Sequence, residues 1–368
     1  KGNVSMLSPY LRHRLLTEHE VIEAVLERHS ASTAEKFIQE VFWRTYWKGW
    51  LQMRPAVWQD FLSERDAERE KLEANSGLTR ALTEAESGQT GIECFDDWAR
   101  ELVETGYLHN HARMWFASIW IFTLKLPWSL GADFFLRHLL DADPASNTLG
   151  WRWVAGIQTR GKTYLARPDN IEKYTNGRYR PTGLADKAEP VRDETPPSKQ
   201  PLAPLPEFSG KRDALLLVHG DDLSAHQLLA PDWTIKSVVV ASGGHADHPW
   251  PFGEKARSFV AAAGADAAER LGDCFDRPIE TTGQLDVGEL GRLADAAGAN
   301  QVLTSEPPVG PLADGLKHLE AGLENHGIDI IRLRRGWDQR AWPYATKGFF
   351  PFKKQISALL EQAGLGAS

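Results

Sequence analysis

The chain has 368 residues, of which 42% are hydrophobic and 25% charged, and this composition excludes general disorder, collagen and low-complexity proteins. Its length allows two domains, each with a core of its own. No apolar run approaches the roughly 18 residues of a membrane span, and the chain does not open with a signal-peptide pattern. Two cysteines, Cys94 and Cys274, cannot form a disulfide framework, so we expect a cytoplasmic protein.

Charge is unevenly shared along the chain. The formal net charge is -8, which argues against a protein covered in nucleic acid. Residues 1–185 carry 23 Lys and Arg against 24 Asp and Glu, whereas the remainder carries 19 against 26. A local basic groove is therefore compatible with the first half and not with the second.

The first half is predicted to be helical. Thr17-Glu18-His19-Glu20 has the form of a capping box and precedes apolar residues at helical spacing, and Thr33 is expected to cap the next helix. Residues 64–87 predict an exposed helix and a loop, and three more helices are expected over 95–108, 111–125 and 131–140. No strand alternation precedes residue 160. We therefore predict an all-helical domain over residues 1–185.

After a linker, the hydrophobic pattern of the second half changes from helical spacing to short apolar runs that alternate with helices. Residues 186–210 hold six prolines among charges and predict an interdomain linker. In residues 211–368, short β-branched runs at 214–218, 235–240, 301–303 and 328–333 alternate with helical stretches near 253–270, 287–298 and 311–326. This alternation predicts a Rossmann-like α/β domain with a parallel sheet covered on both faces. Val218-His219-Gly220-Asp221 lacks the glycine pattern that binds a pyrophosphate, which disfavours a nicotinamide dehydrogenase.

Tryptophan is concentrated in the helical half. Ten of the 14 tryptophans precede residue 185, and this density indicates either large aromatic cores or a task for indole rings such as stacking or electron transfer.

Three stretches of the helical half resemble the FAD-binding domain of the photolyase/cryptochrome family. They are Ser5-Met6-Leu7-Ser8-Pro9-Tyr10-Leu11-Arg12 with the later run 37–44, then Tyr107–Met114, and then Leu139–Trp153. The second half is similar to the α/β domain that usually comes first in photolyases, and its segment Tyr344–Lys353 is similar to a V-F-T-P-F-type motif. The resemblance thus implies the two family domains in swapped order.

The resemblance implies a set of FAD-binding residues. Ser5 and Ser8 match phosphate-binding serines, Arg113 and Asp141 match an ion pair beside the isoalloxazine ring, and Asn147 matches the residue that faces flavin N5. Val4 stands where the family has a threonine, and the expected upstream tyrosine and arginine fall outside the chain. The cofactor residues carried over in this way are Ser5, Leu7, Ser8, Phe37, Glu40, Arg44, Asn110, Arg113, Asp141, Asp143 and Asn147.

Electron transfer and the lesion pocket are implied in the same way. Trp151 and Trp128 match the proximal and middle tryptophans of the chain that reduces flavin, while the surface member is missing near Asn75. A flipped cyclobutane dimer needs aromatic walls, a carboxylate and an amide. Five residues match those positions in cyclobutane-dimer photolyases: Glu40, Trp43, Asn110, Met114 and Trp153. The (6-4) enzymes of the family carry His at the positions of Asn110 and Met114.

Three functions follow from these residues as hypotheses. The preferred one is a lyase, a deoxyribodipyrimidine photolyase, in which reduced flavin absorbs blue light, passes an electron to the dimer and recovers it; Glu40, Asn147, Trp151 and Trp128 would serve catalysis. The alternatives are a cryptochrome-like blue-light receptor without repair and a (6-4) photolyase. We expect a monomer that binds damaged DNA and no membrane, with no metal at the loop histidines His219, His245 and His248 and with an antenna pigment left unspecified.

Overall fold

The computed structural model describes residues 4–192, 197–205, 213–231, 233–243 and 248–366. In these ranges, no helix combines the length and the apolar character that crossing a membrane requires. Packing divides the chain into two compact units, which we describe separately. The helical unit comprises Arg54–Ser198 and Pro251–Arg257, and the sheet unit comprises Lys1–Met53, Lys199–Trp250 and Ser258–Ser368.

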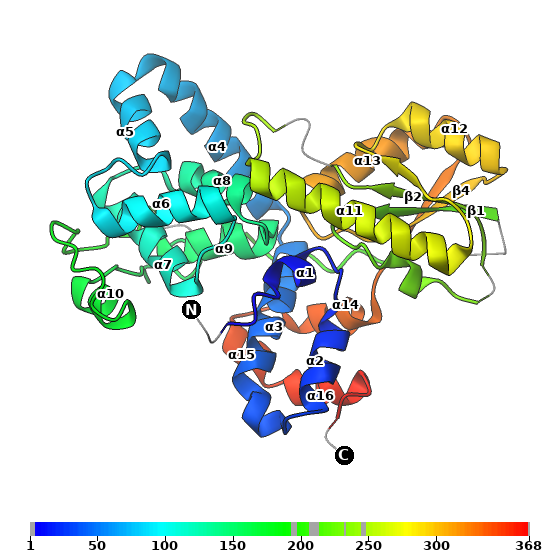
Figure 1. The fold of residues 1–368 in the computed structure, drawn as a ribbon, viewed down its shortest axis with the longest axis horizontal. Coiled ribbons are helices and arrows are strands. Elements are labelled where there is room, and N and C mark those ends of the chain that lie inside the picture. The colour runs from blue at the N-terminus through cyan, green and yellow to red at the C-terminus, as the bar shows by residue number, and fades with distance from the viewer. Residues whose placement is uncertain (1–3, 193–196, 206–212, 232, 244–247, 367–368) are drawn as a thin grey trace. The chain divides into compact units, whose positions relative to one another are not determined.

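Helices within residues 56–174 make up most of the helical unit (Figure 1), and aromatic side chains fill its core. Because most of its tryptophans are below 5% exposed, large cores account for much of the tryptophan density, and Trp153 is the exception at 36%. The last turn of its α7 continues as a π-helical turn, a form that often marks functional sites. Its elements are α4 (Ala56–Ala74), α5 (Ser76–Glu86), α6 (Glu93–Thr105), α7 (Asn110–Ser118), the π turn η1 (Ile119–Thr123), α8 (Trp128–His138), α9 (Pro144–Val154) and α10 (Pro168–Tyr174).

The sheet unit contains a parallel sheet of five strands in the order β3-β2-β1-β4-β5. Leu215 and Leu217 of β1 pack towards α12 and α13, whereas Leu216 and Val218 pack towards α11, because successive side chains of a strand point to opposite faces. The predicted sheet with two covered faces is therefore confirmed. The elements are β1 (Asp213–His219), β2 (Thr234–Ala241), α11 (Glu254–Phe275), β3 (Glu280–Thr282), α12 (Val287–Ala297), β4 (Gln301–Ser305), α13 (Pro311–Glu324) and β5 (Asp329–Leu333).

A second group of helices in the sheet unit joins the two ends of the chain. Trp337 donates its indole N–H to Thr45 Oγ1 at 2.9 Å, and Gly49 lies so close to Trp342 that a Cβ there would be 2.7 Å from the ring. The C-terminal helices thus pack on α3. The group comprises α1 (Ser8–Arg12), α2 (Glu18–Leu26), α3 (Ala31–Gln52), the short turn η2 (Ala225–Leu228), α14 (Gly336–Ala341), η3 (Trp342–Tyr344), α15 (Phe349–Lys353) and α16 (Ile356–Gln362).

Two local predictions have different outcomes. The capping box of Thr17 and Glu20 is present, with Glu20 N–H donating to Thr17 Oγ1 and Glu20 Oε2 accepting from Thr17 N–H. The prediction for the next helix was wrong by three residues: Ser30 is its N-cap and accepts from the N–H of Thr33. Both residues bear hydroxyls, and Ser30 is the N-cap because its backbone is extended, whereas Thr33 already lies within the helix.

The compact units do not coincide with the domain boundaries expected from the sequence. The helices within residues 1–53 pack with the sheet-bearing half, and the division falls after Met53 and Ser198 instead of at residues 185 and 211. The described part of the expected linker 186–210 contains neither helix nor strand. The swapped order of family domains stays a prediction.

Candidate active site

An ion pair joins the start of α7 to the loop before α9 in the helical unit. Arg113 Nη2 lies 3.0 Å from Asp141 Oδ1, and Arg113 Nε donates to the carbonyl of Leu108 at 2.8 Å. The Asp141 side chain is 4% exposed and that of Arg113 is 24% exposed. A buried carboxylate needs a partner, so the pair holds Arg113 in place although its side chain is partly exposed.

The first turn of α9 orients two further predicted cofactor residues. Asp143 is the N-cap and accepts from the N–H of Ser146 at 2.8 Å. One turn later, Asn147 Nδ2 donates to the carbonyl of Ala132 at 2.7 Å. Among the described residues, Asn147 Oδ1 has no hydrogen-bond partner. The amide is thus fixed by its nitrogen and leaves its oxygen available to a donor.

A buried charge network supports the helix on which Asn147 is anchored. Asp133, fully buried on α8, lies 2.7 Å from Arg137 Nε and 3.6 Å from Arg65 Nη1, and Arg137 also bonds Glu86 at 2.7 Å. Because Asp133 directly follows Ala132, the network fixes the carbonyl that holds Asn147. The sequence analysis did not identify it, although the four-residue spacing of Asp133 and Arg137 is a recognisable signal.

Asn110, at the start of α7, lies between two histidines whose rings make contacts of their own. Asn110 is exposed and Met114 is half-buried, and their spacing places them on one face. His111 instead stacks on Tyr174 with a ring-centroid distance of 5.1 Å, and His109 stacks on His111 at 5.4 Å. Burial, together with the charges of His111 and Arg113, lowers the pKa of His109. The histidines that flank Asn110 are thus engaged in ring stacking, and the lowered pKa of His109 favours its neutral form.

The exposed Trp153 lies at the end of α9. It stacks on Tyr164 with a ring-centroid distance of 5.5 Å and remains 36% exposed. An indole that is supported on one side and open on the other offers a flat surface to a planar ligand.

The two predicted electron-transfer tryptophans are buried in the same unit. Trp151 and Trp128 are 3% and 1% exposed, and neither indole N–H has an acceptor among the described residues. Trp151 meets Trp120 edge to face at a centroid distance of 6.1 Å. Gly131 permits this packing, since a Cβ there would lie 2.4 Å from the Trp151 ring. Asn75, where the surface tryptophan was missing, instead caps α5 by accepting from Leu78 N–H.

The predicted phosphate-binding residues lie at the start of the sheet unit. Leu7 is the N-cap of α1 and provides no side-chain cap, so the serines on either side do not serve as caps. The hydroxyls of Ser5 and Ser8 have no hydrogen-bond partner within the described ranges. Met6 has φ 52° and Leu7 is right-handed, an alternation that turns successive backbone N–H groups towards one side, where an anion fits.

Helix α3 carries the other four predicted residues. Phe37, Trp43 and Arg44 are half-buried, and Glu40 is exposed. Partial burial of the carboxyl raises the pKa of Glu40. One face of Trp43 is covered by Phe349, with a centroid distance of 3.6 Å and an interplanar angle of 12°. The sequence analysis missed Phe349, because nothing local indicates a contact across 300 residues.

The residues present fit a flavin dinucleotide. Serine hydroxyls without partners suit phosphate oxygens, a partly exposed arginine suits an electron-rich ring, and the open Asn147 oxygen suits a ring N–H. The predicted residues fall in both units: Ser5, Leu7, Ser8, Phe37, Glu40, Trp43 and Arg44 in the sheet unit, and Asn110, Arg113, Met114, Trp128, Asp141, Asp143, Asn147, Trp151 and Trp153 in the helical unit.

The helical region matches known proteins. The family model described as the FAD binding domain of DNA photolyase matches residues 37–180. These residues, less than half of the chain, are thus similar to a domain whose cofactor is FAD. A deoxyribodipyrimidine photo-lyase of Streptomyces griseus is 32% identical over 180 residues, which cover 45% of this chain and 38% of that protein. One of Alkalihalophilus pseudofirmus is 31% identical over 44% of this chain and 33% of its own length. The similarity to the photolyase family therefore spans only about a third of each relative.

The carboxyl edge of the sheet is filled by the chain's own charges. His219 ends β1 and lies 3.1 Å from Ser305 Oγ at the end of β4, where the strand order reverses. Open α/β sheets bind ligands at this point. Here the buried Arg12 pairs with Asp221 at 2.6 Å, and Asp222 accepts from Arg335. These charges are thus paired within the chain at the edge where such sheets bind ligands.

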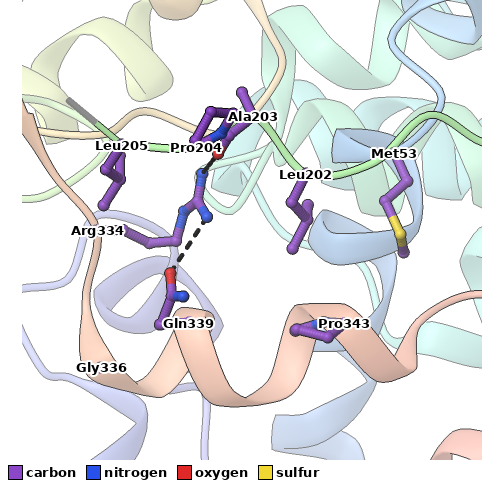
Figure 2. A pocket seen from close by; sticks show the side chains of 9 residues that line it. All are labelled: Met53, Leu202, Ala203, Pro204, Leu205, Arg334, Gly336, Gln339 and Pro343. Atoms are coloured by element: carbon purple, nitrogen blue, oxygen red, sulfur yellow. Dashed lines mark hydrogen bonds between the residues drawn. The ribbon is translucent and has the colours of Figure 1, made fainter. Parts of the chain in front are cut away.

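Elsewhere, the described residues offer few alternatives. They contain no group of His, Cys, Asp or Glu that could hold a metal ion, and His245 lies outside them. Cys94 is buried and Cys274 exposed, both as free thiols, and burial raises the pKa of Cys94 to about 12. An open cavity of about 570 Å³ is lined by Met53, Leu202–Leu205, Arg334, Gly336, Gln339 and Pro343 (Figure 2). The guanidinium of Arg334, which lines this cavity, already donates hydrogen bonds to Glu306, Gln339 and the carbonyl of Ala203.

Proposed function

We propose that this protein is a light-driven, FAD-dependent photolyase that splits cyclobutane pyrimidine dimers in DNA. The observation that carries the proposal is the face of α7. Asn110 and Met114 lie on it together, while the neighbouring imidazoles stack on aromatic side chains. The match of residues 37–180 to the FAD binding domain of DNA photolyase supports the reaction class.

The chain's own residues would divide the work. When bound and fully reduced, FAD supplies the absorption of blue light and an electron that it later recovers, so the reaction has no net redox change. Arg113 would place positive charge at the ring, and Asn147 Oδ1 would accept a hydrogen bond from it. Ser5 and Ser8 would donate to the phosphates. Trp151 and Trp128, buried and readily oxidised, would return the cofactor to its reduced state.

The lesion residues would recognise an extruded pyrimidine dimer through stacking, hydrogen bonds and apolar contact. Trp43 and Trp153 would wall the dimer, Asn110 would hydrogen-bond its edge, and Glu40 would hydrogen-bond it from α3. Partial burial raises the pKa of Glu40, and its carboxyl oxygens can accept a hydrogen bond from a base N–H. Met114 would fill the remaining apolar wall.

Repair of (6-4) products is the second candidate and is less well supported. That reaction needs an acidic imidazole, whereas Asn110 and Met114 stand at the two positions concerned. His109 is the closest substitute in sequence, and its lowered pKa leaves it neutral at physiological pH.

A blue-light receptor without repair is the third candidate, consistent with the net charge of -8.

One experiment separates the three candidates. Purified, photoreduced protein is mixed with oligonucleotides that carry either a cyclobutane dimer or a (6-4) product, and restored thymines are measured by chromatography after blue light or darkness. Light-dependent repair of the dimer alone is the expected result. Repair of the (6-4) product would contradict the assignment of the α7 face. Repair of neither, with FAD bound and photoreducible, would favour the receptor.

A further inference from the structure

The segment around α15 is firmly attached to α3. Phe349 stacks on Trp43, and Phe352 packs against Tyr46 with a centroid distance of 5.4 Å. Tyr46 Oη also donates to the carbonyl of Lys347 at 2.8 Å. Both rings on this side of α15 are buried. The segment is therefore held on α3 by aromatic contacts and a hydrogen bond. The side of α15 opposite Phe349 and Phe352 faces away from these contacts.

The outer side presents an aromatic ring among lysines. Phe350 is 79% exposed, the highest value among the large hydrophobic side chains of the described residues. Lys353 and Lys354 follow Phe350 at helical spacing, and Lys347 lies three residues before it, in the bend that precedes α15. Lys347 and Lys354 are exposed, while Lys353 pairs with Glu35 at 3.1 Å. We call Lys347, Phe350 and Lys354 the wedge surface.

The chemistry of the wedge surface suits a polyanion with accessible bases. Exposing a phenyl ring to water has no structural benefit, and such a ring surrounded by ammonium groups matches proteins that insert apolar side chains between base steps. Lysines bind phosphates as point charges and release counterions. Pro351, next to the ring, fixes φ and reduces the conformational entropy lost on binding.

The position on α3 connects this surface to the lesion residues. Phe349, adjacent to Phe350, covers one face of Trp43, and Glu40 lies one turn before Trp43 on the same stripe of α3. A nucleotide against Glu40 and Trp43 would thus have its neighbours within reach of α15.

We propose that the wedge surface is a DNA-contacting element, in which Phe350 stacks on or between bases beside the damaged site while Lys347 and Lys354 contact backbone phosphates. The inference rests on the proposed function and adds a binding element from the C-terminal end of the chain. DNA is preferred to a lipid surface because of the contact with the lesion residues of α3.

The test compares three proteins with wild type: Phe350→Ala, the double variant Lys347→Ser/Lys354→Ser, and a control, Lys236→Ser/Lys317→Ser. The control removes the same charge from exposed lysines of the same unit that pair with Asp213 and Asp314. Binding to fluorescent duplexes, with and without one cyclobutane dimer, is measured over a series of salt concentrations. FAD content, dimer repair at saturating protein, and sedimentation with phosphatidylserine vesicles are measured alongside.

We expect Phe350→Ala to weaken binding roughly five- to a hundredfold, the range for loss of one stacked base. The lysine variant should lower the slope of log affinity against log salt by about 2, close to 0.9 per lost phosphate contact. FAD content should not change, and the control should bind like wild type. Binding of both test variants at wild-type strength, with repair intact, would overturn the wedge surface and leave the proposed function standing.

The remaining outcomes separate the two proposals. If wild type binds DNA, the variants lose binding and no dimer is repaired, then the proposed function fails and the wedge surface stands. If wild type neither binds nor repairs, both fail. Attachment to vesicles that is lost in the variants, without DNA binding, would assign the surface to a membrane and overturn the inference.

Discussion

At the scale of single residues, the Arg113–Asp141 pair makes the clearest prediction about the cofactor. Arg113→Ala should abolish FAD retention, because it removes the cation proposed to face the flavin ring. It also removes a positive charge from beside the buried Asp141, which should lower stability. FAD per protein is measured by absorbance after gel filtration, and folding by circular dichroism.

A second variant separates cofactor binding from folding. Arg113→Met with Asp141→Asn removes both charges, and it should fold better than Arg113→Ala while still failing to retain FAD. Arg100→Ala serves as the control, since Arg100 makes a surface ion pair with Asp97. Full FAD retention by the double variant would show that the pair has a purely structural role.

Glu40 makes the corresponding prediction about the substrate. Glu40→Ala should lower the quantum yield of dimer repair, because the hydrogen bond to the dimer is lost, while FAD stays bound. Glu23→Ala, on the exposed side of α2, is the control. Quantum yield is measured from restored thymine per absorbed photon. Release of FAD from Glu40→Ala would mean that Glu40 belongs to the cofactor site and not to the lesion pocket.

At the scale of elements, the sequence predicted features that involve sequence neighbours and did not predict contacts between segments far apart in the chain. The capping box of Thr17 and Glu20 and the apolar strands β1, β2, β4 and β5 involve neighbours in sequence, so their patterns are sufficient. Strand β3 was not predicted because Glu280–Thr282 is short and polar and pairs at the edge of the sheet. The stack of Phe349 on Trp43 was not predictable either, since an apolar face does not identify its partner.

The N-terminal segment and the sheet are joined by a buried charge network that makes a prediction about stability. Asp222 accepts from Arg335 Nε and Nη2 at 2.6 Å each and lies 3.3 Å from Arg14 Nη1. Asp222→Asn should lower the free energy of unfolding by about 3–5 kcal/mol, because the buried Arg335 then loses its carboxylate partner, whereas Arg14 keeps Asp338. Urea unfolding measures this loss.

A surface pair supplies the control for Asp222. Asp314 bonds Lys317 at 3.2 Å on the exposed side of α13, so Asp314→Asn should change stability by less than about 1 kcal/mol. Equal effects of the two substitutions would show that the buried network contributes no more than a surface pair.

At the scale of the whole molecule, the two compact units group the chain differently from the two domains expected from the sequence. Residues 1–53 are predicted as helical from periodicity, which is correct. Their partners, however, are the C-terminal helices and the charged edge of the sheet. Periodicity reports which side of a helix is apolar, and buried ion pairs such as Arg12–Asp221 leave no periodic signal.

The two units also differ in the carboxylates that they bury, and this difference predicts their response to acid. In the sheet unit, burial alone would raise the pKa of Asp222, but hydrogen bonds and attraction from Arg335 outweigh it and leave the pKa lowered. Arg12 lowers the pKa of Asp221 against burial in the same way. Burial raises the pKa of Glu86 in the helical unit in spite of Arg137, and it raises the pKa of Asp338 in the sheet unit in spite of Arg14, so Asp338 offsets part of the acid sensitivity of its unit.

The signs of these shifts decide which unit fails first. A carboxylate whose folded pKa is lowered contributes stability above its unfolded pKa, near 4, and loses it as the pH falls through the folded value. A carboxyl whose folded pKa is raised, such as Glu86, contributes in the opposite sense and loses nothing on acidification. Hydrogen exchange by mass spectrometry, corrected for the intrinsic rate, should therefore show protection falling in β1, β4 and α1–α2 below about pH 4, before α6–α8. Asp222→Asn should reduce this acid sensitivity, because its side chain no longer titrates. Earlier loss of protection in α6–α8 would show that another set of groups controls acid unfolding.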